Sequence, residues 1–252
     1  MRLLRLFLLL AAASSAFAEI PLAERRSGYA DMGRETRAMQ DDELTGPAAL
    51  WLLDGEALWA RKAGTAAKAC ADCHAEGLKG VAARYPAVAS SGKLQNLEQR
   101  INECRVERQQ APALAAESRD LLALAAYVGR QSRGLPIADP LRDPRARPHW
   151  EAGRRSFAQR LGQLNLSCAQ CHDERWGRSL AGTTIPQGQA TGYPIYRLEW
   201  QTMGSLHRRL RNCMIGVRAE PYAWGSREAL ELELYLAWRA RGLPLETPAV
   251  RP

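Results

Sequence analysis

Two copies of the pentapeptide Cys-x-x-Cys-His constrain this 252-residue chain more than any other feature. The pentapeptide attaches c-type haem, because its thiols add to the vinyl groups and its imidazole becomes the proximal iron ligand. We therefore predict two covalently bound haem c groups and a redox function. The predicted haem-binding cysteines are Cys70, Cys73, Cys168 and Cys171, and the predicted proximal iron ligands are His74 and His172.

Zinc is the main alternative, because a Cys-x-x-Cys pair can form half of a four-ligand zinc site. Two features favour haem. Each pair carries its histidine at the position that haem attachment requires, and the chain begins like an exported protein. Zinc and simple disulfides remain as the less favoured readings of these cysteines.

The N-terminus has the pattern of a secretory signal peptide. A positively charged start at Arg2 leads into an apolar stretch that reaches Ala13, and Ala16-Phe17-Ala18 fits a small-x-small cleavage site. The apolar run is too short to span a bilayer, and no later segment is apolar enough to do so. We predict a signal peptide over residues 1–18, cleavage after Ala18, and a periplasmic mature protein without a membrane span.

The formal net charge of +8 raises the question of a nucleic-acid partner. The arginines are scattered along the chain, and an exported cytochrome meets no nucleic acid, so we expect no such partner. A local cluster is more informative. Four arginines lie close in sequence to Cys213, namely Arg208, Arg209, Arg211 and Arg218.

An internal repeat predicts the architecture. When the two haem motifs are aligned, further residues match before and after them. The matched pairs are Gly55 with Gly153, Trp59 with Phe157, Gly64 with Gly162, Cys104 with Cys213, Tyr127 with Tyr235, and Arg133-Gly-Leu-Pro136 with Arg241-Gly-Leu-Pro244. The chain is therefore a duplicated unit. We predict an all-α fold of two tandem class I-like cytochrome c domains.

The predicted boundaries follow from the repeat. An N-terminal extension covers residues 19–50, the first domain residues 51–137, and the second domain, with the active site, residues 138–252. We expect a helix that leads into each haem motif, and a closing helix in each unit with Ser118 and Ser226 as N-caps. The segment from Leu230 to Leu236 alternates like a strand, but its Leu and Glu residues favour helix. Extra residues near 176–200 are expected to form a surface loop.

The remaining two cysteines are candidates for the sixth iron ligand, which is usually Met or His. In the first unit, Met is absent from residue 40 to 202 and His from 75 to 148, so Cys104, a lysine or water remains. The second unit also contains Met203, Met214 and His207, which we assign to packing or hydrogen bonding. Since Cys213 matches Cys104, we predict a Cys ligand for each iron. The alternative is a disulfide between these two residues, which an oxidising compartment permits.

Arg209 precedes Cys213 by one turn of an expected helix, so both side chains share a face. A guanidinium group favours the thiolate form of cysteine and binds oxyanions through paired hydrogen bonds. Arg218 follows closely as a second candidate. This pattern indicates an anionic sulfur substrate, with catalytic roles for Cys213, Arg209 and Arg218. Pairing of the arginines with haem propionates or surface acids is the simpler alternative.

The segments from Arg209 to Tyr222 and from Tyr193 to Trp200, together with the dihaem layout, resemble SoxA, the catalytic subunit of the SoxAX cytochromes. The resemblance covers nearly the whole mature chain. It implies that thiosulfate is joined oxidatively to a cysteine of a SoxYZ-like carrier. It further implies that two electrons pass through haem to a SoxX-like monohaem cytochrome in a heterodimer.

The resemblance also assigns residues. It makes Cys213 the active-site thiolate, often a persulfide, on the second haem, and it makes Arg209 the active-site arginine, with Arg218 a weaker match. The first haem, with His74 and Cys104, becomes a structural or relay centre. Two other functions remain open. One is a thiosulfate dehydrogenase that forms tetrathionate, and the other is a dihaem cytochrome that only transfers electrons.

Overall fold

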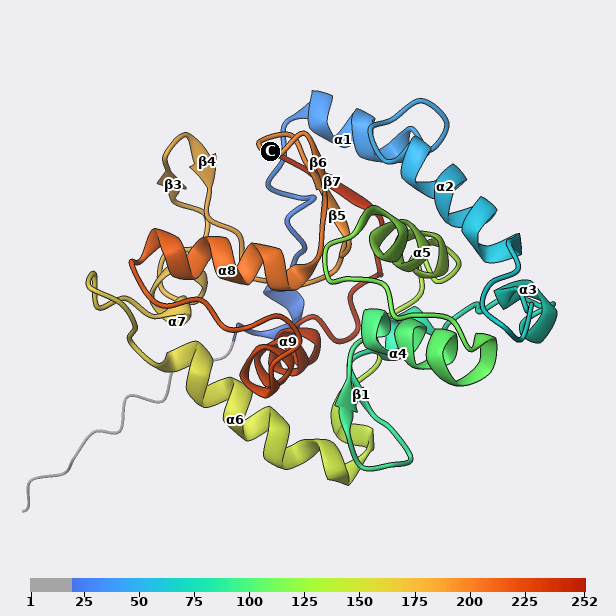
Figure 1. The fold of residues 1–252 in the computed structure, drawn as a ribbon. Helices are drawn as coiled ribbons and strands as arrows, with labels where there is room; N and C mark the ends of the chain where they lie inside the picture. The colour runs from blue at the N-terminus through green and yellow to red at the C-terminus, as the bar shows by residue number, and fades with distance from the viewer. Residues whose placement is uncertain (1–19) are drawn as a thin grey trace, which may run out of the picture.

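The structure is a computed structural model that describes residues 20–252, and its fold is mostly helical (Figure 1). The predicted signal peptide lies outside these residues. The α-helices are α1 Arg34–Asp41, α2 Ala49–Ala60, α3 Cys70–Cys73, α4 Leu97–Cys104, α5 Arg119–Arg130, α6 Arg147–Ala158, α7 Cys168–His172, α8 Leu206–Gly216 and α9 Arg227–Arg239. Shorter 3₁₀ turns cover Leu22–Glu24, Ala82–Arg84, Pro140–Arg142 and Pro144–Ala146, and a π-helical turn covers Arg105–Gln109.

Small sheets complete the fold. The strands are β1 Ala87–Val88, β2 Leu94–Gln95, β3 Ser179–Leu180, β4 Thr183–Thr184, β5 Ile195–Arg197, β6 Thr202–Gly204 and β7 Ala249–Arg251. The first four form two antiparallel pairs, and β5 lies between antiparallel β6 and parallel β7. No helix within residues 20–252 is long and apolar enough to cross a membrane.

The duplication is visible in two equivalent helix pairs, α2 with α5 and α6 with α9. Each pair crosses at a glycine. A Cβ atom at Gly55 would overlap with the carbonyl oxygen of Ala123, and a Cβ atom at Gly153 would overlap with that of Glu231. The matched glycines of the sequence repeat therefore have the same role, which is to let two helix backbones approach closely.

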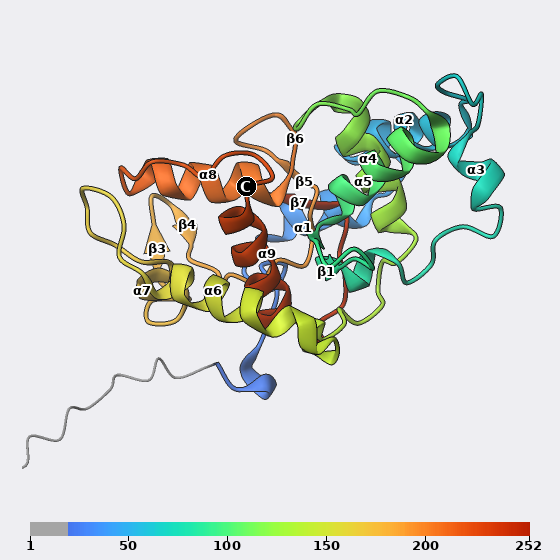
Figure 2. The same cartoon turned by 60° about the horizontal axis from the view of Figure 1, so that its bottom comes forward.

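The two units are joined through their matched Arg-Gly-Leu-Pro segments. Pro136 and Pro244 form an antiparallel bridge, and Ile137 N–H donates to the carbonyl of Leu243 at 2.9 Å. Antiparallel pairing of equivalent segments gives a local two-fold relation between the units. Consistent with it, Figures 1 and 2 place α3 and α7 at opposite ends of the molecule.

The π-helical turn Arg105–Gln109 explains an irregularity of the repeat. The first unit has one more residue between Cys104 and Tyr127 than the second has between the matching Cys213 and Tyr235. A π-helical turn accommodates such an additional residue. Beyond it the units agree again, because the loop before each haem motif bonds to the same place. Ala66 N–H donates to Gln109 O, and the matching Leu164 N–H donates to Val217 O.

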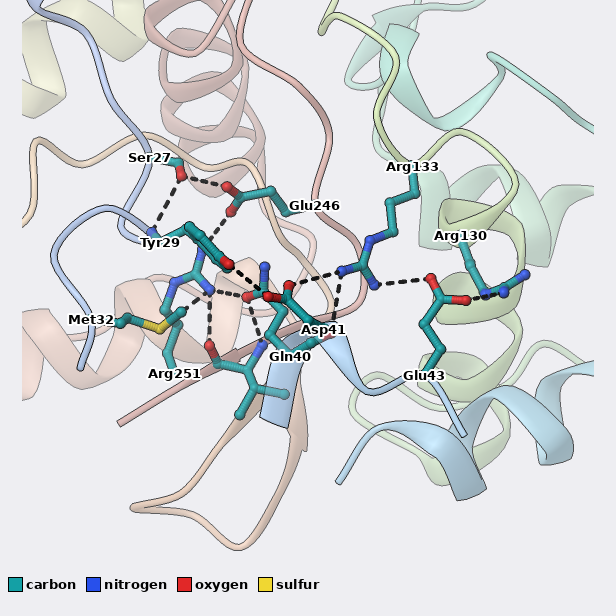
Figure 3. Close-up of polar contacts among 11 residues, drawn as sticks. Ser27, Tyr29, Met32, Gln40, Asp41, Glu43, Arg130, Arg133, Glu246 and Arg251 are labelled. Atoms are coloured by element: carbon teal, nitrogen blue, oxygen red, sulfur yellow. Dashed lines mark hydrogen bonds and ion pairs between the residues drawn. The ribbon is translucent and has the colours of Figure 1, made fainter. Parts of the chain in front are cut away.

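The N-terminal extension is docked against the second unit (Figure 3). Helix α1 packs on β7, where the Gln40 side chain accepts a hydrogen bond from Val250 N–H at 3.2 Å and another from Arg251. Arg251 also pairs with Glu246, whose carboxylate accepts from Ser27. At its other end, Glu43 pairs with Arg130 and Arg133 of the first unit. The extension therefore contacts both units.

Two details differ from the sequence-based expectation. The preceding helices α2 and α6 do not lead into the haem motifs, since they end at Ala60 and Ala158 and each motif starts its own short helix. The intervening loops turn at Gly64 and Gly162, where φ is +66° and +68°. The segment at 176–200 is also only partly a surface loop, because the exposed β3–β4 hairpin is followed by the buried start of β5.

The closing helices form as predicted. α9 is continuous through the alternating segment, and the hydroxyls of Ser118 and Ser226 accept hydrogen bonds from Leu121 N–H and Ala229 N–H. The alternation places leucines such as Leu234 in the core, and the intervening Glu231 is also buried. Burial on nearly all sides explains why the helical period is weak in this segment.

Candidate functional site

Each haem motif lies beside an aromatic side chain from the preceding helix. The ring centroids of Trp59 and His74 are 5.8 Å apart, and those of Phe157 and His172 are 6.4 Å apart. In each motif the two cysteines stand on one short helical segment, directly before the histidine. Thiols and imidazole are therefore presented from one segment, which fits covalent attachment of a haem c group beside its proximal ligand.

The later cysteine of each unit lies near the haem motif of the same unit. Burial, and after it the charge of the nearby Cys213, raise the pKa of Cys168 to about 12. In the first unit, burial raises the pKa of Cys70, and Cys104 adds to the rise. The repeat thus brings each candidate sixth ligand to its own motif.

The alternative cysteine chemistries find no matching geometry in residues 20–252. All of the cysteines there are free, so Cys104 and Cys213 form no disulfide. Within the same residues, no group of three or more histidine, cysteine, aspartate or glutamate side chains is arranged to hold a metal ion. Neither Cys-x-x-Cys pair is therefore completed by the further side chains of a zinc site.

His172 is oriented by the loop that follows it. Its Nδ1 lies 2.7 Å from the carbonyl oxygen of Pro186, so Nδ1 carries the proton and Nε2 is left to bind iron. Burial lowers the pKa of the ring, which favours the neutral form that a ligand needs. Gly188 allows this close approach, because a Cβ atom there would lie 3.2 Å from Cγ of His172. This donor arrangement fits a haem ligand.

Arg209 and Cys213 stand one turn apart on α8, and both are half-buried. Burial alone would lower the pKa of Arg209. The charges of Cys213, Tyr193 and Glu199 outweigh burial and raise the pKa instead. The guanidinium therefore remains a cation beside the sulfur of Cys213, and this arrangement suits the binding of an anion next to a nucleophilic sulfur.

Sequence reasoning gave no role to two residues of this site, although both lie in the segment from Tyr193 to Trp200 that carries the family resemblance. Burial raises the pKa of Tyr193, and the charges of Arg209 and Cys213 also act on it. Arg197 on β5 is close enough that Arg209 lowers its pKa, after burial, while Glu199 pairs with it at 2.7 Å. No spacing in the sequence links these residues to α8. The tertiary fold places them near Arg209.

The arginine cluster around Cys213 separates in three dimensions. Arg208 lies 4.5 Å over the ring of Trp200, and Arg211 donates to the carbonyl of Tyr222. Arg218 is exposed, in a left-handed conformation with φ +58°, and within residues 20–252 its side chain makes no hydrogen bond or ion pair with Cys213. Of these arginines, Arg209 is the one that the fold brings to Cys213.

The histidines outside the haem motifs have acidic partners. His207 Nε2 lies 2.9 Å from Glu233, and His149 Nδ1 lies 2.9 Å from Glu231. Met203 and Met214 are buried.

The chain matches known proteins along most of its length. The family model described as SoxA/TsdA, cytochrome c domain, matches residues 54–137 and again 152–245. The chain is 39% identical to the L-cysteine S-thiosulfotransferase subunit SoxA of Rhodovulum sulfidophilum over 232 residues, which cover 90% of this chain and 80% of that protein. It is 38% identical to the subunit of the same name from Pseudaminobacter salicylatoxidans over 235 residues, 92% of this chain and 82% of that protein.

A solved structure agrees with these sequence matches. The crystal structure of SoxXA from Paracoccus pantotrophus contains a chain with a TM-score of 0.85 and 33% identity, covering 90% of this chain and 86% of that one. The predicted pair of cytochrome c domains is thereby confirmed, and cytochrome c domains carry covalently bound haem c. The chain belongs to the SoxA family of c-type cytochromes.

Proposed function

We propose that this protein is an L-cysteine S-thiosulfotransferase subunit, which joins thiosulfate oxidatively to a cysteine of a SoxYZ-like carrier protein. The observation that carries the proposal is the cation of Arg209 beside the sulfur of Cys213, next to the second haem motif. The names of the relatives from Rhodovulum sulfidophilum and Pseudaminobacter salicylatoxidans support the same activity.

Two haem c groups are part of the proposal. The first is attached to Cys70 and Cys73 with His74 and Cys104 as iron ligands, and the second to the matching residues of the other unit. Supporting this assignment, each later cysteine acts electrostatically on the first cysteine of its own motif. When bound, the haem groups supply the path by which electrons leave the substrate sulfur atoms.

The residues at the second motif have separate roles in the proposed mechanism. Arg209 binds the sulfonate end of thiosulfate through paired hydrogen bonds and leaves the terminal sulfur facing Cys213. Tyr193, whose pKa burial raises, stays protonated and can donate a hydrogen bond to the same anion. The sulfur of Cys213 lies next to the terminal sulfur of the thiosulfate that Arg209 holds. Arg218 remains a candidate that guides the anion toward the site.

The reaction balances without a further reagent beyond the electron acceptor. The carrier thiol R–SH and thiosulfate, S₂O₃²⁻, give R–S–S–SO₃⁻, one proton and two electrons. One S–S bond forms, the S–H bond breaks, and the two sulfur atoms that join are oxidised. The acceptor in the proposal is a SoxX-like monohaem cytochrome that forms a heterodimer with this chain and takes the two electrons one at a time. The similarity to a chain of the SoxXA crystal structure supports this partner.

Localisation and boundaries complete the proposal. A periplasmic protein with a signal peptide removed after Ala18 accounts for haem attachment at both motifs. The first domain covers residues 51–137 and the second residues 138–252. The N-terminal extension covers residues 19–50, and its helix α1 packs on β7 of the second domain.

The test is product analysis with the purified heterodimer, thiosulfate, the carrier and an oxidised cytochrome. Mass spectrometry should find an S-sulfonate disulfide, R–S–S–SO₃⁻, on the carrier cysteine, and its amount should match half of the electrons counted. Tetrathionate formed equally well without the carrier would instead identify a thiosulfate dehydrogenase. Electron transfer without either product would leave only an electron-transfer cytochrome.

A further inference from the structure

Arg239 is a buried cation at the end of α9. Its side chain is only 4% exposed, its guanidinium lies 4.5 Å over the ring of Phe157, and it forms an ion pair with Asp173 at 2.6 Å. A buried charge is costly unless it is paired. Asp173 directly follows His172, and Phe157 is the aromatic neighbour of the same histidine. The cation therefore belongs to the surroundings of His172, although the mechanism proposed above does not use it.

Arg239 also binds the loop that follows His172 and that contains its hydrogen-bond acceptor, Pro186. Its Nη2 donates to the carbonyl oxygen of Gln187 at 3.0 Å. The preceding residue, Pro186, provides the carbonyl that accepts from Nδ1 of His172 at 2.7 Å. One guanidinium thus fixes both the residue after the histidine and the residue after its hydrogen-bond acceptor.

Gln187 connects this loop to the N-terminal extension. Its side chain is 1% exposed, accepts from Arg26 N–H at 2.9 Å and donates to the carbonyl of Glu24 at 2.9 Å. Both the oxygen and the nitrogen of this side-chain amide are therefore hydrogen-bonded to the backbone of the extension. The loop behind His172 is fixed by α9 on one side and by residues 24–26 on the other.

The first unit has a neutral side chain at the matching position. Gln131 occupies the position that matches Arg239 in the repeat, and it accepts a hydrogen bond from Leu78 N–H at 2.6 Å. A neutral side chain thus holds the loop after His74, whereas an ion pair holds the loop after His172. The repeat itself provides the control, because the same position is charged beside one motif and neutral beside the other.

We propose that Arg239, Asp173, Gln187 and residues 24–26 form a proximal clamp that orients His172 and sets the reduction potential of the second haem independently of the first. The inference rests on the haem site proposed above. A cation near iron favours the reduced state, and an unbalanced carboxylate favours the oxidised state. Hydrogen bonding to a ligating histidine tunes the metal in addition. Arg239 is a positioning residue in this account, because it acts through His172.

The charge part of the proposal is tested by redox titration of the purified holoprotein, in which each haem is followed by its own spectral change. Arg239→Gln introduces the side chain of the first unit and leaves Asp173 unbalanced. We expect the oxidised-to-reduced ratio of the second haem, measured at the wild-type midpoint potential, to rise at least tenfold. This corresponds to a midpoint that is lower by about 59 mV for one electron. The first haem should not shift. Asp173→Asn combined with Arg239→Gln should return the second haem toward the wild-type midpoint.

Gln131→Leu is the matched control, and it should affect only the first haem. An unchanged second-haem midpoint in Arg239→Gln, or an equal shift of both haems, would overturn the proposal. A double variant that stays at the shifted midpoint would also overturn its charge balance. Haem content, measured on the same samples, separates these results from failure of the haem assignment, since a protein lacking the second haem would contradict the proposed function itself.

The positional part is tested with Gln187→Leu, which fills the same space but cannot bond to residues 24–26. Limited proteolysis of the holoprotein should cut this segment faster than in the wild type. The low-spin EPR signal of the second haem should broaden, because His172 is held less firmly. Faster cleavage with an unchanged second-haem signal, or no faster cleavage, would contradict a clamp that acts through the extension.

Discussion

Cys213 stands one helical turn after Arg209, and its charge helps to raise the pKa of that guanidinium although burial acts in the opposite direction. A cation held next to a sulfur atom is suited to an anionic sulfur compound. Thiosulfate carries two negative charges, and its sulfonate oxygens match the fork of a guanidinium group. The relationship therefore leads to a prediction about which arginine the reaction requires.

Arg209→Ala should lower kcat/KM for thiosulfate by about 10- to 100-fold, because a hydrogen bond to a charged group contributes roughly 1.5–3 kcal/mol. Arg209→Lys keeps the charge without the fork and should be intermediate. The matched control is Arg208→Ala on the same helix, where the guanidinium stacks on Trp200 instead. Equal losses in Arg208→Ala and Arg209→Ala would contradict a specific role for Arg209.

Much of the fold could be predicted from the sequence, because the residues that match between the two repeats have specific structural roles. Gly55 and Gly153 match because both allow a close helix crossing, and Ser118 and Ser226 match because both cap a helix. The haem motifs fix chemistry as well as position. Equivalent positions in the two units therefore predicted equivalent structure, including α9, where local alternation pointed to a strand.

The remaining features depend on contacts that no local pattern records. Tyr193 reaches Arg209 because β5 pairs with β6 and β7, and β7 comes from the end of the chain. The extension docks on the second unit through Gln187, a residue with no motif around it. Sequence spacing also overestimated the arginine cluster, since neighbours such as Arg211, which lies over the ring of Trp224, have other partners.

The close helix crossings predict a stability effect. Gly153→Ala should lower the free energy of unfolding by about 2–3 kcal/mol, because the added methyl group meets the backbone oxygen of Glu231, which cannot move aside like a side chain. Gly55→Ala should behave alike. Gly216→Ala is the control, since a Cβ atom there has nothing within 4 Å. Denaturant unfolding of the three holoprotein variants measures the difference, and similar values for Gly153→Ala and Gly216→Ala would refute it.

A half-buried acidic cluster between the units predicts a pH effect. Burial, and then the charge of Glu233, raise the pKa of Glu98 to about 7 from its ordinary 4.5. Burial alone would lower the pKa of His207, but its hydrogen bond to Glu233 and the acids around it raise that pKa. Both groups hold a proton more tightly in the folded state than in the unfolded chain.

Because Glu98 binds its proton more tightly in the folded state, folding is favoured at low pH. The stabilisation by protonated Glu98 is complete below about pH 4.5 and is lost as the pH rises through about 7. The free energy of unfolding should therefore fall by roughly 2 kcal/mol between pH 5 and 8, at about 1.4 kcal/mol per pKa unit. Glu98→Gln should flatten this fall, whereas Glu56→Gln at an exposed position should not. Equal slopes in both variants would argue against the cluster.

The haem assignment predicts a mass. The periplasmic form should weigh as much as the polypeptide from Glu19 plus two haem groups, since both motifs are complete. A Cys168→Ser, Cys171→Ser double variant should lose one haem group and retain the first. Intact-mass spectrometry reads out both results directly. A wild-type mass with a single haem, or with zinc, would disprove the dihaem assignment.

The central claim is that the sulfur of Cys213, and not that of its repeat partner Cys104, supports turnover. Each cysteine follows an arginine by one helical turn, but Arg100 is paired with Glu103, whereas Arg209 forms no ion pair within residues 20–252 and is left to bind an anion. The most direct measurement is thiosulfate-dependent reduction of an added cytochrome in the presence of the carrier, for Cys213→Ala and Cys104→Ala side by side. We expect Cys213→Ala to abolish turnover, and Cys104→Ala to keep it while the first-haem spectrum changes. Near-normal rates in Cys213→Ala would contradict the account and leave the chain an electron carrier.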